Sequence, residues 1–231
     1  MQQLKIGGIT PFTSIDYPGR LAAVIFVQGC PWRCRYCHNP HLQPRVSQAG
    51  PEWKETMRWL QRRVGLIDAV VFSGGEATID PALPAAMRDV RSLGFQVGLH
   101  TAGIYPHKLA DLLPQVDWVG LDIKAPFAHY EQVTQVADSG RLALRSVEAV
   151  LASGIPCEMR TTIHPALLAE DDILSLACTL AKKGVTEYAL QLFRPQGCGD
   201  ARLDPVPAGY PSPALLQRLH GMFPRFVLRQ A

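Results

Sequence analysis

Three cysteines near the amino terminus, Cys30, Cys34 and Cys37, have the spacing C-x3-C-x2-C. Three thiolates on one short loop can bind three irons of a [4Fe–4S] cubane and leave the fourth iron without a protein ligand. An open coordination position suits a metal centre that activates a substrate, whereas a structural zinc site closes with four ligands. His38 could supply a fourth ligand, but its adjacency to Cys37 makes a tetrahedral site awkward. The spacing therefore predicts an iron–sulfur cluster, with a zinc-dependent module as the alternative.

Two further motifs carry groups that could hold a polar ligand. Gly74 and Gly75 would let the backbone approach a ligand closely, although glycine pairs also mark ordinary turns. Asp122 and Lys124 lie two residues apart and should share one side of a strand end. A carboxylate suits ribose hydroxyls and an ammonium suits a ligand carboxylate, whereas a surface ion pair is the alternative.

Short apolar runs followed by helical patterns account for most of the chain and would position these motifs. We predict strands at 21–28, 68–73, 95–101, 118–123, 156–162 and 186–192. We predict helices at 51–63, 81–93, 106–113, 141–153, 168–183 and 213–221. This alternation implies an α/β fold with parallel strands and right-handed crossovers. It fits an open six-unit barrel and a doubly wound sheet equally well.

Polar residues cluster where the predicted strands end. The clusters are Cys30–Cys37, Ser73–Glu76, His100–Thr101, Asp122–Lys124, Arg160–Thr162 and Gln191–Arg194. The carboxyl ends of parallel strands meet at one edge, which is where α/β proteins place their chemistry. We therefore expect one site, within a single domain over 1–231 that has its core at about 15–195 and an irregular extension at about 196–231.

Composition narrows the class of protein and its partners. The net charge of +3 is spread along the chain without a dense basic block, so we expect no nucleic-acid partner. The longest apolar run, 21–27, is too short to cross a bilayer, and the amino terminus lacks the signal-peptide pattern. We therefore expect a cytoplasmic protein without a membrane partner, in which six reduced cysteines favour metal binding over disulfides.

The cysteine loop, with Tyr36 before its third cysteine, resembles that of the radical S-adenosylmethionine superfamily. Ser14–Arg20 (SIDYPGR), Gln28–Cys30 and Tyr36–Pro40 resemble the glycyl radical enzyme activases more closely. Within them, the chain is most similar to the activating proteins of anaerobic (class III) ribonucleoside-triphosphate reductases. The similarity covers about Ile6 to Arg194 and is most specific over 13–40. It implies a partial (β/α)6 barrel.

The resemblance also implies a chemistry. A [4Fe–4S] cluster on Cys30, Cys34 and Cys37 would reductively cleave S-adenosylmethionine, and a Cα hydrogen would be taken from a glycine of a partner enzyme. That partner would be an anaerobic ribonucleotide reductase, and the electron donor a flavodoxin or ferredoxin. The alternatives are a pyruvate formate-lyase-like partner or a small-molecule substrate, as in a deazapurine-forming synthase. No general acid or base is needed for hydrogen-atom abstraction.

The matching positions imply cofactor contacts, among which the Gly-Gly-Glu motif would meet the methionine amino group. The implied contacts are Tyr36, His38, Ser73, Gly74, Gly75, Glu76, Thr101, Asp122, Lys124, Arg160, Thr162 and Gln191. From their position before the first strand, Asp16 and Arg20 are candidates for docking the partner. One departure stands out, because His100 replaces the Asp of an Asp-Thr-Asn-Gly strand end in the pyruvate formate-lyase branch. The roles of His100, Cys157, Cys178 and Cys198 stay open.

Overall fold

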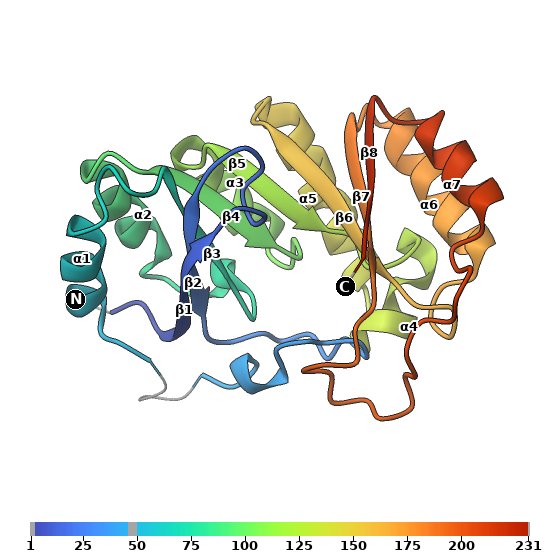
Figure 1. Ribbon diagram of the computed structural model, residues 1–231, viewed down its shortest axis with the longest axis horizontal. Coiled ribbons are helices and arrows are strands. Elements are labelled where there is room, and N and C mark those ends of the chain that lie inside the picture. The colour runs from blue at the N-terminus through green and yellow to red at the C-terminus, as the bar shows by residue number, and fades with distance from the viewer. Residues whose placement is uncertain (1–2, 46–49, 231) are drawn as a thin grey trace.

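The computed structural model describes residues 3–45 and 50–230 and shows one sheet of eight strands in the order β1 to β8 (Figure 1). Strand β1 is antiparallel to β2, and every later neighbouring pair is parallel. The strands are β1 (Ile6–Thr13), β2 (Ala22–Val27), β3 (Ala69–Gly74), β4 (Gln96–Thr101), β5 (Trp118–Asp122), β6 (Cys157–Ile163), β7 (Glu187–Leu192) and β8 (Arg225–Arg229).

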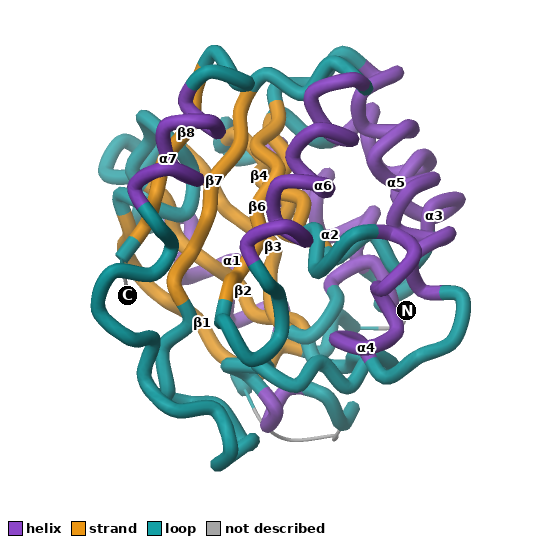
Figure 2. The backbone as a smooth tube through the Cα atoms, turned by 90° about the vertical axis from the view of Figure 1, so that its right-hand side faces the viewer, coloured by secondary structure: helices purple, strands orange, loops and turns teal. Residues whose placement is uncertain are grey.

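The principal helices lie on the outer side of this curved sheet (Figure 2). They are α1 (Trp53–Gln61), α2 (Leu83–Ser92), α3 (Pro106–Leu112), α5 (Ser139–Ser153), α6 (Glu170–Lys182) and α7 (Pro213–His220), with the short α4 (Tyr130–Thr134) beside the cysteine loop. Each helix of the outer layer joins two parallel strands, so the predicted α/β fold with six strand–helix units is confirmed. Among the described residues no strand pairing joins β1 to β8, so the barrel is open. No helix in the described ranges combines the length and the apolar character needed to cross a bilayer.

The sequence reading missed the two edge strands. Strand β1 contains two glycines and Pro11, which weaken a strand signal but are tolerated at a sheet edge. Strand β8 has only five residues and begins and ends with arginine. The stretch 196–231 was expected to be irregular, but after Ser212 it forms the expected α7 and then β8, which pairs with β7.

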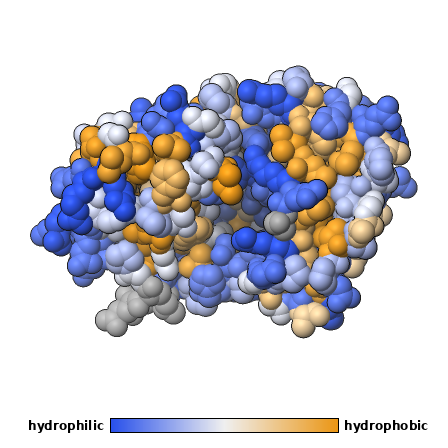
Figure 3. Space-filling view, in the orientation of Figure 1, coloured by the Kyte–Doolittle hydropathy of each residue, from blue (hydrophilic) through white to orange (hydrophobic). Residues whose placement is uncertain are grey.

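The carboxyl ends of the parallel strands lie along the lower edge in Figure 1, where residues 28–45 cross beneath them. The face of the molecule that is turned toward the viewer in Figure 1 has a hollow near its centre, and hydrophilic residues make up most of the border of this hollow (Figure 3). The topology therefore gathers the six predicted polar clusters at one edge of the sheet.

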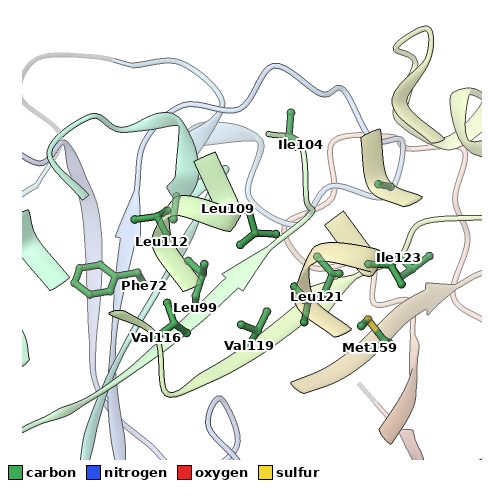
Figure 4. Packing of buried hydrophobic residues seen from close by; sticks show 14 of the residues in the cluster. Phe72, Leu99, Ile104, Leu109, Leu112, Val116, Val119, Leu121, Ile123 and Met159 are labelled. Carbon is green, nitrogen blue, oxygen red and sulfur yellow. The ribbon is translucent and has the colours of Figure 1, made fainter. Parts of the chain in front are cut away.

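Alternate strand residues face two different apolar clusters. On the outer face, Phe72 and Leu99 pack with Leu109 and Leu112 of α3 (Figure 4). On the inner face, small residues of β2 and β3 surround Tyr17 and Trp118, whose rings stack with centroids 5.2 Å apart. Trp118 begins β5, so the inner apolar cluster closes the amino ends of the strands. The inner space at the carboxyl ends is left to polar side chains.

Candidate active site

One cavity lies between the cysteine loop and the strand ends. Its lining from the loop consists of Cys30, Trp32, Cys34, Tyr36, Cys37, His38, Asn39 and Gln43. Its lining from the strand ends consists of Ser73, Gly74, Gly75, His100, Thr101, Ala102, Asp122, Lys124, Thr162 and Gln191. Of the residues predicted from the sequence to bind the cluster or the cofactor, all except Glu76 and Arg160 therefore line a single cavity.

Backbone hydrogen bonds hold the cysteine loop on both sides. On one side, Gly29 and Cys30 donate to the carbonyls of Leu42 and Gln43, at 2.7 and 3.1 Å. On the other, the Arg33 amide donates to the Thr134 carbonyl of α4 at 3.0 Å. Trp32 is buried against Tyr130 of the same helix, with ring centroids 5.7 Å apart. The three cysteines are thus presented by a loop with a fixed conformation.

The cysteine side chains suit a polynuclear metal centre. All three are free and partly buried, and burial raises the pKa of Cys30 to about 12, with Glu76 adding to the effect. Burial also raises the pKa of Cys34, against the opposing charge of Lys124. A bound metal offsets such penalties because it stabilises the thiolate form. In an iron–sulfur cubane each of three thiolates binds a different iron, so the three cysteines need not converge on one metal ion.

The Gly-Gly-Glu segment joins the cysteine loop to the neighbouring strands. Gly74 has a φ of +126°, and a Cβ there would lie 2.2 Å from the Val27 carbonyl oxygen, so only glycine fits. The Glu76 amide donates to the Gly29 carbonyl at 2.8 Å. The Glu76 carboxylate is buried and accepts from the Thr101 hydroxyl at 2.7 Å and the Ala102 amide at 2.9 Å. Glu76 therefore stands behind the cavity wall and ties the end of β3 to that of β4.

Asp122 and Lys124 form an ion pair within the cavity, with Lys124 Nζ 3.2 Å from Asp122 Oδ2. Burial raises the pKa of Asp122, but the charges of Lys124 and Arg160 outweigh it and the pKa is lowered. Burial lowers the pKa of Lys124, but the Asp122 charge reverses the shift. Both groups are therefore charged near neutral pH, and they offer a ligand one anionic and one cationic partner.

Tyr36 and His38 complete the loop side of the cavity. The Tyr36 hydroxyl is buried and has no hydrogen-bond partner among the described residues. A buried hydroxyl without a partner is costly, and a bound ligand can satisfy it. His38 stacks on Phe193, and its Nε2 is 3.0 Å from the Arg194 carbonyl oxygen. Burial lowers the pKa of His38, so it is neutral near pH 7.

Arg160 lies deeper than the sequence suggested. It is buried below the cavity, donates from Nε to Glu158 at 2.8 Å, and lies 5.0 Å from the Trp118 ring centroid. Arg229 of β8 donates to both oxygens of Glu158, each at 2.7 Å. Arg160 therefore belongs to a charge network that links β6 to the last strand. Through Arg229, β8 thus helps to hold the Glu158–Arg160 pair in the interior of the barrel.

His100 lines the cavity and also contacts the loop before β2. Its Nε2 is 2.8 Å from the Asp16 carbonyl oxygen, and Arg160 Nη1 lies 3.2 Å from the same nitrogen. Burial and the Arg160 charge lower the pKa of His100 to about 4. Arg20 is exposed, and neither Asp16 nor Arg20 lines the cavity.

Five cavity residues were not among the predicted contacts: Trp32, Asn39, Gln43, His100 and Ala102. Trp32 and Asn39 fall within or next to the cysteine motif, so proximity in sequence could have found them. No sequence pattern marks Gln43 as a cavity residue, because it reaches the cavity only where residues 39–43 return beneath the strand ends. Cys157, Cys178 and Cys198 do not line the cavity. Cys198 nevertheless lies beside the cysteine loop, with its thiol 3.4 Å from the Arg35 carbonyl oxygen.

Comparison with known proteins assigns the chain to a family. The sequence profile of the Radical SAM superfamily matches residues 24–177. A protein of Methanocaldococcus jannaschii described as a candidate glycyl-radical enzyme activating enzyme is 30% identical over 211 residues, which cover 87% of this chain and 85% of its own. The chain belongs to the radical SAM glycyl-radical enzyme activating enzymes. The pyruvate formate-lyase-activating enzyme of Streptococcus mutans is 29% identical over 71% of this chain and 66% of its own.

Solved structures agree with the fold of this activase. SuiB of Streptococcus suis, bound to the precursor peptide SuiA, superposes with a TM-score of 0.70 at 12% identity. The match covers 89% of this chain, which spans about half (48%) of SuiB. QueE of Escherichia coli superposes with a TM-score of 0.59 at 17% identity and covers 99% of this chain and 95% of its own. At these identities the likeness concerns the fold alone.

The radical SAM family implies a [4Fe–4S] cluster and S-adenosylmethionine, and the cavity fits both. Three thiols suit the cluster, while the Asp122–Lys124 pair and the unpartnered Tyr36 hydroxyl suit a polar, zwitterionic ligand. When bound, the cluster supplies the electron for reductive cleavage of S-adenosylmethionine. The residues of this chain that line the cavity would hold and orient the ligand. The comparisons support the activase family without singling out the ribonucleotide reductase branch.

Proposed function

We propose that this chain installs a glycyl radical on a partner enzyme of the pyruvate formate-lyase type. In the overall reaction, S-adenosylmethionine and one electron give methionine, and a Cα hydrogen of the partner's glycine ends on 5′-deoxyadenosine. The observation that carries the proposal is the match over nearly the full length of an activase-like relative, combined with one cavity that gathers the cysteines and the strand-end residues. The pyruvate formate-lyase-activating enzymes among its relatives favour that partner class.

An anaerobic ribonucleotide reductase is the second candidate partner. The strand end His100–Gly103 departs from the Asp-Thr-Asn-Gly of the pyruvate formate-lyase branch. Here His100 Nε2 donates to the Asp16 carbonyl at 2.8 Å, so this nitrogen holds the loop before β2 and does not replace the missing carboxylate. This departure favours a partner outside that branch.

The test is an anaerobic electron paramagnetic resonance experiment. Reconstituted chain, dithionite and S-adenosylmethionine are mixed with each candidate partner in turn, and the expected result is a glycyl doublet on one of them. Cys34→Ala should abolish the doublet, whereas Cys178→Ala, a cysteine on α6 away from the cavity, should retain it. Formation of 5′-deoxyadenosine without a doublet on either partner would contradict the proposed partners and favour a small-molecule substrate.

Asp16 and Arg20 are proposed to dock the partner's glycine segment. The loop that carries them exposes Ile15 to 73%, and Arg20 is exposed beside it. Asp16 accepts a hydrogen bond from the Thr13 hydroxyl at 2.7 Å, so its carboxylate also shapes this loop. In the same experiment Arg20→Gln should weaken the doublet and leave 5′-deoxyadenosine formation intact. An unchanged doublet would remove Arg20 from the docking surface.

A further inference from the structure

A second depression lies beside the cysteine loop, and Cys34 and Cys37 line both it and the active-site cavity. Its other contributions come from residues 33–43, from Gln135 after α4, and from residues 199–202 of the segment that follows β7. The two cysteines therefore stand between the cofactor cavity and a second, more open surface. A cluster held by these cysteines would therefore lie close to the depression as well as to the cavity.

The charge of this depression is positive. Arg33, Arg35 and Arg202 line it together with a single carboxylate, Asp200, which gives a net charge of +2. Arg202 donates to both oxygens of Asp200, at 2.7 and 2.9 Å, and Arg35 Nε lies 3.4 Å from the same carboxylate. Two guanidiniums thus share one carboxylate, so the depression keeps an excess of positive charge. The Arg202 side chain is 76% exposed.

The arginines are fixed relative to the cysteines. Arg33 donates from Nη1 to the carbonyls of Cys30 and Trp32, at 2.6 and 2.9 Å. The Arg35 carbonyl in turn accepts from the Cys198 thiol at 3.4 Å, which holds the 198–202 segment against the loop. The positive charge therefore belongs to the cysteine loop and to the 198–202 segment that packs against it, rather than to unrelated surface side chains.

We propose that this arginine depression is the docking surface for an acidic one-electron carrier protein that reduces the cluster. Electron tunnelling slows steeply with distance. S-adenosylmethionine bound in the cavity would cover that side of the cysteines, so a donor would approach from the depression that Cys34 and Cys37 also line. A positive surface around that depression attracts an acidic carrier and orients it. In this step the carrier loses one electron and the cluster gains it, with no group transferred. The inference rests on the proposed radical chemistry, but not on which glycyl radical enzyme is activated.

The test compares two double variants that remove the same charge. Arg35→Gln/Arg202→Gln removes two positive charges from the depression. Arg62→Gln/Arg88→Gln removes two from exposed positions, one directly after α1 and one on α2. Both helices lie at the far end of the molecule from α4 in Figure 1. The probe is a reduced acidic flavodoxin, mixed anaerobically with the cluster-loaded chain. Cluster reduction is followed by stopped-flow absorbance, and binding of the same flavodoxin is measured by calorimetry.

We expect the first variant to lower the second-order rate constant at low salt by about tenfold, the lower end of typical steering effects. Its affinity for flavodoxin should fall as well, and both differences should shrink at high salt because exposed charges are screened. The control pair should match the wild type, and reduction by dithionite should be unchanged in every protein.

Equal rates and affinities for the two double variants would overturn the proposal, and so would a loss that dithionite reproduces. If the first variant fails to load its cluster, Arg202→Glu alone provides the comparison, because its side chain is mostly exposed. A failure of the proposed function is distinguishable. If the radical chemistry were wrong, wild type would form no 5′-deoxyadenosine even with dithionite. If only the partners were wrong, 5′-deoxyadenosine would form without a glycyl doublet, and the comparison of the two double variants would still decide the docking surface.

Discussion

Glu76→Gln is the sharpest test of how the active-site edge is held together. The Glu76 carboxylate is 1% exposed and accepts four hydrogen bonds from two neighbouring segments. One oxygen accepts from the Thr78 amide at 3.2 Å and from the hydroxyls of Thr78 and Thr101 at 2.5 and 2.7 Å. The other accepts from the Ala102 amide at 2.9 Å. Glutamine has the same shape, but one of its two terminal atoms is a donor.

Either orientation of the new amide places its NH2 against a backbone N–H. If the NH2 replaces the first oxygen it opposes Thr78, and if it replaces the second it opposes Ala102. Losing a hydrogen bond to a charged acceptor costs about 1.5–3 kcal/mol, and leaving a buried donor unpaired costs about 1–3 kcal/mol. Since the two hydroxyls can rotate to donate elsewhere, we expect the free energy of unfolding to fall by about 3 kcal/mol in total.

The assay is anaerobic urea unfolding, with Glu55→Gln as the matched control on the exposed side of α1. Glu76→Gln should lower the midpoint at an unchanged m-value, as expected when stability changes and the exposed surface does not. Glu55→Gln should shift the free energy of unfolding by less than about 0.5 kcal/mol, as is usual for surface changes. A Glu76→Gln shift as small as that of the control would refute the assigned bridging role.

Two further predictions concern the backbone and the pH dependence. Gly74→Ala should destabilise the chain by about 3 kcal/mol or more. The added Cβ would clash with the Val27 backbone, and alanine would be strained at the positive φ of this position. Gly94→Ala, at φ +89° with nothing within 4 Å of the added Cβ, should cost only about 1–2 kcal/mol in the same unfolding assay; equal costs would contradict the close approach at Gly74. Folding lowers the pKa of His100 to about 4, so as the pH falls the unfolded chain takes up this proton at a higher pH than the folded chain does. The free energy of unfolding should therefore decrease progressively as the pH falls from about 6.5 to 4. His100→Asn should flatten the unfolding free energy between pH 6.5 and 5, and an unchanged slope would show that His100 does not carry this dependence.

The alternation of strands and helices could be predicted because it depends on local periodicity. Apolar runs such as 21–27 mark strands that are covered on both faces, and the helices between them repeat at helical spacing. The edge strands β1 and β8 could not be predicted in this way. Their sequences are rich in glycine or charge, and only pairing with β2 and β7 makes them strands.

The candidate active site could likewise be predicted only in part. The cysteine spacing and the strand-end positions predicted which segments meet, because the ends of parallel strands always share an edge. The sequence could not tell that Glu76 faces the wall, since that direction is set by the backbone turn at Gly74. Arg160 shares a strand face with Thr162 but lies one two-residue repeat, roughly 6.6 Å, deeper in the barrel.

The sequence by itself predicted the candidate metal ligands, the fold class and the edge of the sheet at which the polar residues gather, because spacing and periodicity are local properties. Only the tertiary structure decided which side chains reach the cavity and which support it from behind. It also brought Asp200 and Arg202 beside Arg35, although they lie more than 160 residues apart in the chain. Such contacts depend on how the last third of the chain packs back against the cysteine loop, and no local pattern encodes that packing.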